Sequence, residues 1–214
     1  MNAARTRLIR RILKPAAFVL LGLPLAWLAV QWFWLLRDGT GSLGINPIEA
    51  SIHHTGLWAL RILLLTLAIS PLTRLTHLTP LMSIRRMCGL YAFAYAAVHL
   101  MLYFGLDLEF SVTALWADIL KRWYIALGMA ALVLMVPLAI TSTARAIKAL
   151  GARRWQRLHR LVYAVGALAV LHFWLVVKGI QTEPLIYMGI YAILMLARLP
   201  RLRQSAAHKK KAGH

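Results

Sequence analysis

Two histidines, His99 and His172, lie inside long apolar stretches of the sequence. An ionisable side chain is costly in a membrane, so an intramembrane histidine is a functional candidate by default. His99 follows Arg86, and His172 follows Arg160, by distances that a helical rise of about 1.5 Å per residue converts to roughly 18–20 Å. Both rings are therefore predicted at one depth, on two different helices. Two neutral imidazoles at matched depth are what the axial positions of a haem iron require.

The alternative is that each histidine is an unrelated core residue whose ring is hydrogen-bonded to a backbone carbonyl. That interpretation is the better one for a lone histidine. A pair at one depth, in a chain with few other polar groups in its apolar stretches, favours haem ligation instead.

His159 precedes His172 by thirteen residues and is predicted about 20 Å nearer the start of the same helix. It is a candidate ligand for a second, inner haem. On a straight helix, however, the side chains of His159 and His172 point about 140° apart. Ligation on one face needs a bend near Gly166 or looser geometry at the start of the helix.

Arg85 and Arg86 stand on the third apolar stretch at the level where a second inner ligand is expected. Arg85 lies only about 40° from His99 in helical projection, but a guanidinium offers donors and no lone pair to a metal. We expect it to pair with a haem propionate or a flavin phosphate. Ordinary anchoring of basic residues at the cytoplasmic surface explains both arginines equally well.

His53 and His54 lie at the predicted outer end of the second apolar stretch, beside Asn46 and Glu49. They either cap this helix or face a partner. A cofactor role is the less favoured interpretation of this pair.

The composition places these residues in a membrane protein. The chain of 214 residues is 61% hydrophobic and only 14% charged, which is more apolar than a soluble domain of this length. Six stretches are long enough to cross a hydrocarbon core of about 30 Å, where only helices satisfy their own backbone groups. They cover about residues 16–36, 57–76, 88–106, 123–142, 158–177 and 184–199. We predict an all-α integral membrane bundle of six transmembrane helices, in a single domain over 1–214.

The charges set the predicted orientation. Most of the 25 Lys and Arg residues fall in the two terminal segments and in the loops after the second and fourth spans, whereas the six acidic residues fall on the other side. The positive-inside rule then places both termini in the cytoplasm, with basic tails at about 1–14 and 200–214. The net charge of +19 thus indicates a multi-pass protein of the bacterial cytoplasmic membrane. It does not indicate a nucleic-acid partner, because the basic residues are not gathered on one soluble face.

Two observations bound the expected redox chemistry. The only cysteine is Cys88, and no C-x-x-C-H motif is present, so any haem is expected to be non-covalent haem b. A G-x-G-x-x-G match, GTGSLG at 39–44, follows an apolar span instead of a strand, and no soluble nucleotide-binding domain remains outside the spans. Electrons are therefore expected from a quinol or another flavoprotein rather than directly from a nicotinamide.

Four segments match a known family in order across the second to fifth spans. They are GINPIEASIHHTGLWALRILLLTLAISPL (44–72), RRMCGLYAFAYAAVHLMLY (85–103), DILKRWYIALG (118–128) and RRWQRLHRLVYAVGALAVLHFWLVVK (153–178). With these segments the chain resembles the MsrQ (YedZ) family, the haem-binding membrane subunits of the periplasmic methionine sulfoxide reductase system, within the ferric-reductase-like transmembrane superfamily. The haem-associated histidines of that family fall on His99, His159 and His172.

The resemblance implies an electron-transfer subunit that binds one or two b-type haems and FMN. It implies a quinone or a cytosolic flavin reductase as electron donor, and a separate periplasmic molybdenum-containing subunit as acceptor. That partner reduces methionine sulfoxide in oxidised proteins, so the catalytic site is expected there. The wider superfamily usually has a fourth histidine where this chain has Arg85 and Arg86, which leaves the inner haem open.

Two other functions stay open from the sequence. The chain could be a stand-alone transmembrane ferric reductase or metalloreductase that acts at the outer surface. It could also be a non-redox membrane scaffold whose histidines only satisfy contacts between helices.

Overall fold

The structure, a computed structural model, describes residues 3–176 and 181–198, and within these ranges it contains helices and no strand. The predicted basic tail at 200–214 lies outside the described residues. In chain order the elements are α1 (Ala3–Asp38), α2 (Pro47–Thr76), the 3-10 helix η1 (Thr79–Ser83), α3 (Arg85–Leu102), the π-helical turn η2 (Tyr103–Asp107), α4 (Val112–Lys121), α5 (Trp123–Ile140), α6 (Ala144–His159), α7 (Leu161–Val176) and α8 (Thr182–Leu196). The all-α prediction is confirmed.

Five helical stretches in the described part of the chain are long and apolar enough to cross a membrane. They are Arg11–Asp38, Pro47–Thr76, Arg85–Asp107, Trp123–Ile140 and Ala144–Val176. The sixth predicted span corresponds to Thr182–Leu196, an apolar helix that is shorter than the other five. Large apolar side chains such as Phe18, Leu20 and Ile193 are exposed on the outside of the helices, where lipid replaces water around a membrane bundle.

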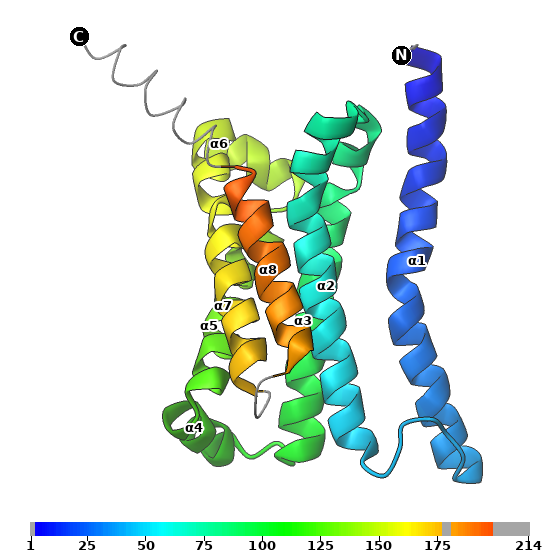
Figure 1. Cartoon of the computed structure of the whole chain (residues 1–214), viewed down its shortest axis with the longest axis vertical. Helices are drawn as coiled ribbons and strands as arrows, with labels where there is room; N and C mark the ends of the chain where they lie inside the picture. Colours follow the sequence, from blue (N-terminus) through cyan, green and yellow to red (C-terminus); the bar gives the residue numbers. More distant parts are fainter. Residues whose placement is uncertain (1–2, 177–180, 199–214) are drawn as a thin grey trace.

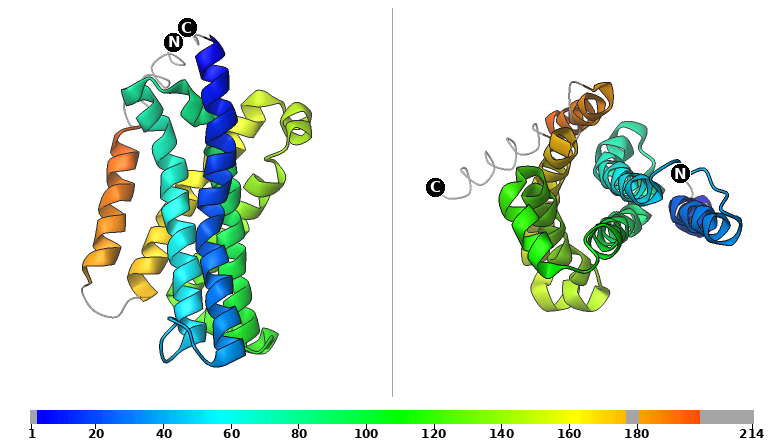
Figure 2. Two further views of the ribbon diagram at one scale, coloured as in Figure 1. Left: turned by 90° about the vertical axis from the view of Figure 1, so that its right-hand side faces the viewer. Right: turned by 90° about the horizontal axis from the view of Figure 1, so that it is seen from below.

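Two helix pairs form the centre of the bundle. α2 packs mainly against α3, and α5 packs mainly against α7, while α8 covers α7 and α2. The buried core of the bundle includes Ile62 of α2, Tyr95 of α3 and Val165 of α7. α1 stands at one side of the bundle, against α2 and α3 (Figures 1 and 2).

Polar contacts fix α1 to the bundle near Pro24. The Tyr95 hydroxyl of α3 donates to the Leu21 carbonyl at 2.7 Å and accepts from the Leu25 N–H at 3.2 Å. In an uninterrupted helix the Leu25 N–H would donate to the Leu21 carbonyl. The Tyr95 hydroxyl is inserted between these two groups, and such an insertion is a common cause of helix bending. The Trp32 indole also donates to the Ser51 hydroxyl of α2 at 2.9 Å.

The two ends of the bundle differ, and we name them by their short helices. The α4 end carries α4 and the connection between α1 and α2, and the α6 end carries α6, η1 and the start of α1 (Figure 1). α2 begins at the α4 end with an N-cap, in which Asn46 Oδ1 accepts the Glu49 N–H at 3.2 Å. The side-chain Nδ2 of Asn46 also donates to Glu49 Oε2 at 3.1 Å.

The segment before the predicted fifth span departs from the prediction. Residues 143–157 were expected to be a basic loop but form most of α6, which bends at Gly151, where φ is 72°. A milder irregularity falls at Arg160, between the last residue of α6 and the first of α7, where the backbone stays helical with φ −69° and ψ −20°. α6 and α7 therefore run on as one helical stretch, and His159 is the last residue of α6.

Candidate cofactor site between two helix pairs

His99 is oriented by the helix beside it. Its Nδ1 lies 2.8 Å from the carbonyl oxygen of Ile52, one turn into α2. The ring also lies directly over Gly56, because a Cβ added there would be 2.9 Å from His99 Cε1 and Nδ1. Since a real Cβ does not approach so closely, only glycine at position 56 permits this ring position.

His172 has the same arrangement on the other helix pair. Its Nδ1 lies 2.6 Å from the carbonyl oxygen of Tyr124, near the start of α5. A Cβ added at Gly128 would be 2.9 Å from His172 Cε1 and Nδ1. In both pairs, the accepting carbonyl and the glycine are four residues apart on the helix next to the histidine. The same arrangement of histidine, carbonyl and glycine therefore occurs in both helix pairs.

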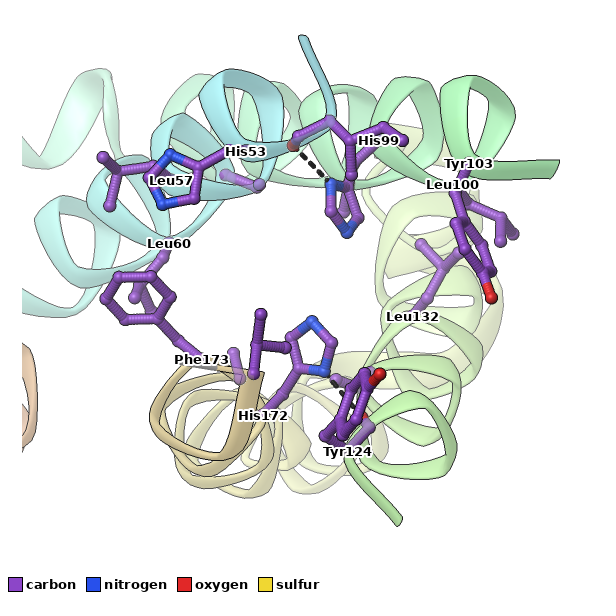
Figure 3. A pocket seen from close by; sticks show the side chains of 18 of the residues that line it. His53, Leu57, Leu60, His99, Leu100, Tyr103, Tyr124, Leu132, His172 and Phe173 are labelled. Atoms are coloured by element: carbon purple, nitrogen blue, oxygen red, sulfur yellow. Dashed lines mark hydrogen bonds between the residues drawn. The ribbon is translucent and has the colours of Figure 1, made fainter. Parts of the chain in front are cut away.

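These contacts fix which nitrogen of each ring is available. A carbonyl oxygen only accepts, so Nδ1 of each histidine carries the proton and donates. In a neutral imidazole the other nitrogen, Nε2, then holds a lone pair. Figure 3 shows that these second nitrogens of His99 and His172 point toward one another across a cavity.

The distance between the two rings suits one metal ion between them. Their centroids are 6.3 Å apart and their planes meet at 80°. Two metal–imidazole bonds of about 2 Å each, together with half of each ring, span roughly 6 Å. The predicted juxtaposition of His99 and His172 at one level is therefore confirmed, and the pair fits axial coordination from opposite sides.

The cavity around the pair is large and mostly apolar. Its volume is about 680 Å³, and it lies between α2, α3, α5 and α7. Within the described residues, no group of three or more His, Cys, Asp or Glu side chains is placed to hold a metal ion. Two histidines suffice when the ligand brings its own equatorial donors, as an iron porphyrin does. A flat macrocycle with mostly apolar faces also suits such a lining.

His159 has a different environment at the α6 end. Its Nδ1 faces the carbonyl of Trp155, four residues earlier in its own helix, at 3.2 Å. Its ring stacks on the Trp155 indole, with centroids 3.9 Å apart. Its Nε2 is buried and makes no close hydrogen bond with the described residues, although the backbone of Leu138 in α5 lies near the ring. Among the described residues no second histidine contacts this ring, and His159 does not line the cavity of His99 and His172.

The backbone around His159 departs from a regular helix at one place. An irregular turn stands at Arg160, at the start of the predicted fifth span, whereas α7 continues without a break through Gly166. Arg85 lies within electrostatic range of the His159 ring, at the first residue of α3. Neither Arg85 nor Arg86 lines the cavity of the facing histidines, and their proposed pairing with a propionate or phosphate stays a prediction.

The neighbouring His53 and His54 point in different directions. His53 lines the cavity, and its ring lies 6.2 Å from that of Phe173 of α7 (Figure 3). His54 turns toward α1, where its Nε2 lies 3.1 Å from the Pro24 carbonyl and its ring stacks on Trp27 at 4.9 Å. One histidine of this pair thus belongs to the cavity and the other to the attachment of α1.

Several residues of the site were not found from the sequence. Gly56 and Gly128 admit the two rings, and the carbonyls of Ile52 and Tyr124 orient them. Arg122 also lines the cavity, at the α4 end. A glycine inside an apolar span next to a histidine-bearing span could have indicated the two glycines. The carbonyl acceptors could not be predicted, because every residue type has the same backbone carbonyl.

The fold and the site together define a class, a polytopic helical membrane protein with facing histidines in an apolar cavity. The sequence model of the family described as "Ferric reductase like transmembrane component" matches residues 55–170, which run from α2 into α7, include His99 and end two residues before His172. The chain belongs to this family and, within it, to the group of heme-binding MsrQ subunits, because it shares 46–50% of its residues with curated members over most of its length. It is accordingly a multi-pass integral protein of the bacterial inner membrane.

Three of these relatives carry the same name, "Protein-methionine-sulfoxide reductase heme-binding subunit MsrQ". The protein of Xanthomonas campestris pv. campestris is 48% identical over 189 residues, which cover 86% of either chain. That of Xanthomonas axonopodis pv. citri is 50% identical over 172 residues, 80% of this chain and 78% of the relative. That of Caulobacter vibrioides is 46% identical over 184 residues, 86% of this chain and 85% of the relative.

Proposed function

We propose that this protein is the haem-binding membrane subunit of a protein-methionine-sulfoxide reductase system and carries electrons across the membrane. The observation that supports this most strongly is the facing pair His99 and His172, whose Nε2 atoms are left available by the carbonyl contacts of Nδ1. The names of the relatives, which are heme-binding subunits, agree with this use of the pair.

The residues of the cavity would hold haem b without a covalent bond. His99 and His172 are the proposed axial ligands, and the apolar side chains of four helices exclude water from the faces of the ring. When bound, an iron porphyrin accepts and releases single electrons, which no side chain of the cavity does on its own. The Ile52 and Tyr124 carbonyls keep both imidazoles in one tautomer and one orientation.

His159 is proposed to contribute to a second, inner haem or to the FMN site. Its buried Nε2, which makes no close hydrogen bond with the described residues, and the nearby charge of Arg85 support this assignment, because an unsatisfied buried nitrogen calls for an occupant. Arg85 and Arg86 are proposed to hold the propionate of that haem or the phosphate of FMN, through charge-assisted hydrogen bonds.

We further propose six transmembrane helices with both termini in the cytoplasm. In this topology Thr182–Leu196 is the sixth span, the basic α6 end is cytoplasmic and the α4 end is periplasmic. Basic residues such as Arg85, Arg154 and Arg157 lie toward the α6 end, whereas Asp107, Glu109 and Asp118 lie toward the α4 end, as the positive-inside rule requires.

The proposed partners follow from the resemblance. Electrons come from the quinone pool or a cytosolic flavin reductase at the α6 end. They leave at the α4 end for a periplasmic molybdenum-containing subunit, which holds the catalytic site for methionine sulfoxide and repairs oxidised proteins. The lining of the cavity reaches this α4 end at Asn46, Glu49 and Arg122.

The test is the absorption spectrum of the full chain purified from haem-replete cells. The protein should be red, with a low-spin haem spectrum that changes on reduction, and quantified haem and flavin per chain give the number of cofactors. A colourless preparation contradicts the proposal and favours a scaffold. Reduction of a ferric chelate by the purified chain, without a periplasmic subunit, favours the stand-alone metalloreductase that the family description also permits.

A further inference from the structure

The polar groups of the cavity are not evenly distributed. Apart from the two facing histidines, all polar side chains of its lining lie at or near the α4 end. They are Asn46, Glu49, His53, Tyr103, Arg122 and Tyr124. Beyond the histidines, toward the α6 end, the lining consists of apolar side chains such as Leu63, Met135 and Val165.

This asymmetry limits how a porphyrin can enter. Haem b carries its two ionised carboxylates on one edge, and burying an unpaired carboxylate among apolar groups costs several kcal/mol or more. The carboxylate edge must therefore face the α4 end. On the α2 side of that end stands Glu49, which is held by Asn46 and repels a second carboxylate. The basic side chain in the lining is Arg122, on the opposite side.

Arg122 pairs with an acidic side chain that does not line the cavity. It occupies the extended junction between α4 and α5, with φ −118° and ψ 97°. Its Nε lies 3.4 Å from Asp118 Oδ1, one turn earlier in α4, and the Tyr103 hydroxyl donates to the other oxygen of the same carboxylate. Tyr103 and Arg122 line the cavity, whereas Asp118 does not. Asp118 therefore restrains both groups without facing the cavity itself.

We infer that Arg122 binds the carboxylate edge of the haem held by His99 and His172, and that Asp118 and Tyr103 position the guanidinium for it. This inference rests on the proposed function. A guanidinium suits the task because its planar fork meets a carboxylate with two parallel hydrogen bonds. Its five N–H donors also allow it to contact Asp118 and a ligand at once.

The experiment compares haem b with its dimethyl ester, which keeps the iron and the ring but lacks the negative charges. The full chain, produced in haem-depleted cells, is titrated with each compound and the ratio of their affinities is measured. The wild-type protein should prefer haem b by about two- to fivefold, as expected for an ion pair of a half-exposed guanidinium. Arg122→Gln should bring the ratio close to one. Arg37→Gln is the matched control, because Arg37 pairs with Asp38 at the same end but does not line the cavity.

Equal ratios in the wild type and Arg122→Gln overturn the inference. A wild-type chain that binds neither compound contradicts the proposed function instead, so the two failures differ. Should Arg122→Gln not fold, Arg122→Lys replaces it, since lysine keeps the charge but loses the fork. The ratio for Arg122→Lys should fall below that of the wild type, and an unchanged ratio overturns the inference. Asp118→Asn should give an intermediate ratio, because the guanidinium remains but is no longer restrained.

Discussion

The two levels of the bundle that carry histidines are built in different ways. At the level of His99 and His172, each ring is held by a carbonyl of a neighbouring helix, faces the other ring and borders a cavity. At the level of His159, the ring contacts a carbonyl and an indole of its own helix, and no second histidine among the described residues contacts it. Depth and residue type alone therefore do not define a pair of ligands, because a neighbouring helix must also orient each ring toward the other.

We expect the largest effect on haem binding from alanine at either of the two facing histidines. Removal of one axial ligand leaves the iron with a single imidazole, so His99→Ala and His172→Ala should each lose all low-spin haem of the cavity. His159→Ala should keep low-spin haem, because its ring lies outside that cavity. The measurement is the reduced-minus-oxidised spectrum of each purified variant. Full haem retention in all three variants would falsify the assignment of ligands.

The next largest effect is expected at the glycines under the rings. Gly56→Ala and Gly128→Ala place a Cβ where the His99 or His172 ring now lies, so the ring must move or its carbonyl contact must break. We expect haem to bind about tenfold more weakly, the scale of overpacking in a tight core. Gly189→Ala in α8 is the control, because an added Cβ there meets nothing within 4 Å. Haem titration that shows equal affinity for all three variants contradicts the role of the glycines.

A subtler effect concerns the electronic structure of the ferric haem. The His99 and His172 planes meet at 80°, and perpendicular imidazoles leave two iron d orbitals nearly equal in energy. The wild-type protein should therefore show a low-spin EPR signal of large g anisotropy from this site. A signal of the kind given by parallel imidazoles indicates that the rings turn on binding, against the carbonyl contacts.

The smallest effect should come from Arg85→Gln. Arg85 is near His159 and away from the cavity, so haem held by His99 and His172 should change in affinity by less than about twofold, as for independent sites. Any FMN or second haem should decrease instead. Cofactor content per chain, measured for this variant beside the wild type, separates the two levels, and loss of the cavity haem alone contradicts the separation.

The sequence predicts the helices and the facing pair better than it predicts their surroundings. His99 and His172 could be paired because helical rise is constant, and a count from Arg86 and Arg160 gives depth directly. The first helix was predicted over 16–36 but runs from Ala3 to Asp38, since helical hydrogen bonds continue past the apolar segment. The irregular turn at Arg160 could not be predicted, because it contains neither proline nor glycine.

Other features depend on contacts between distant segments. The opposite directions of His53 and His54 follow from a carbonyl and an indole of α1 on one side and Phe173 on the other. The position of Arg122 depends on Tyr103 through Asp118. No periodicity within one helix contains this information, so it emerges only when the helices are packed.

The contacts of the two facing histidines also fix the register of one helix along another within each pair. A slip of α2 by a single turn, about 5.4 Å, brings another carbonyl to the His99 ring but replaces Gly56 with Ile52 or Leu60. The side chain of either residue would occupy the space of the ring. Both the acceptors and the glycines belong to the polypeptide itself. The register that orients the two rings is therefore specified by contacts within the protein.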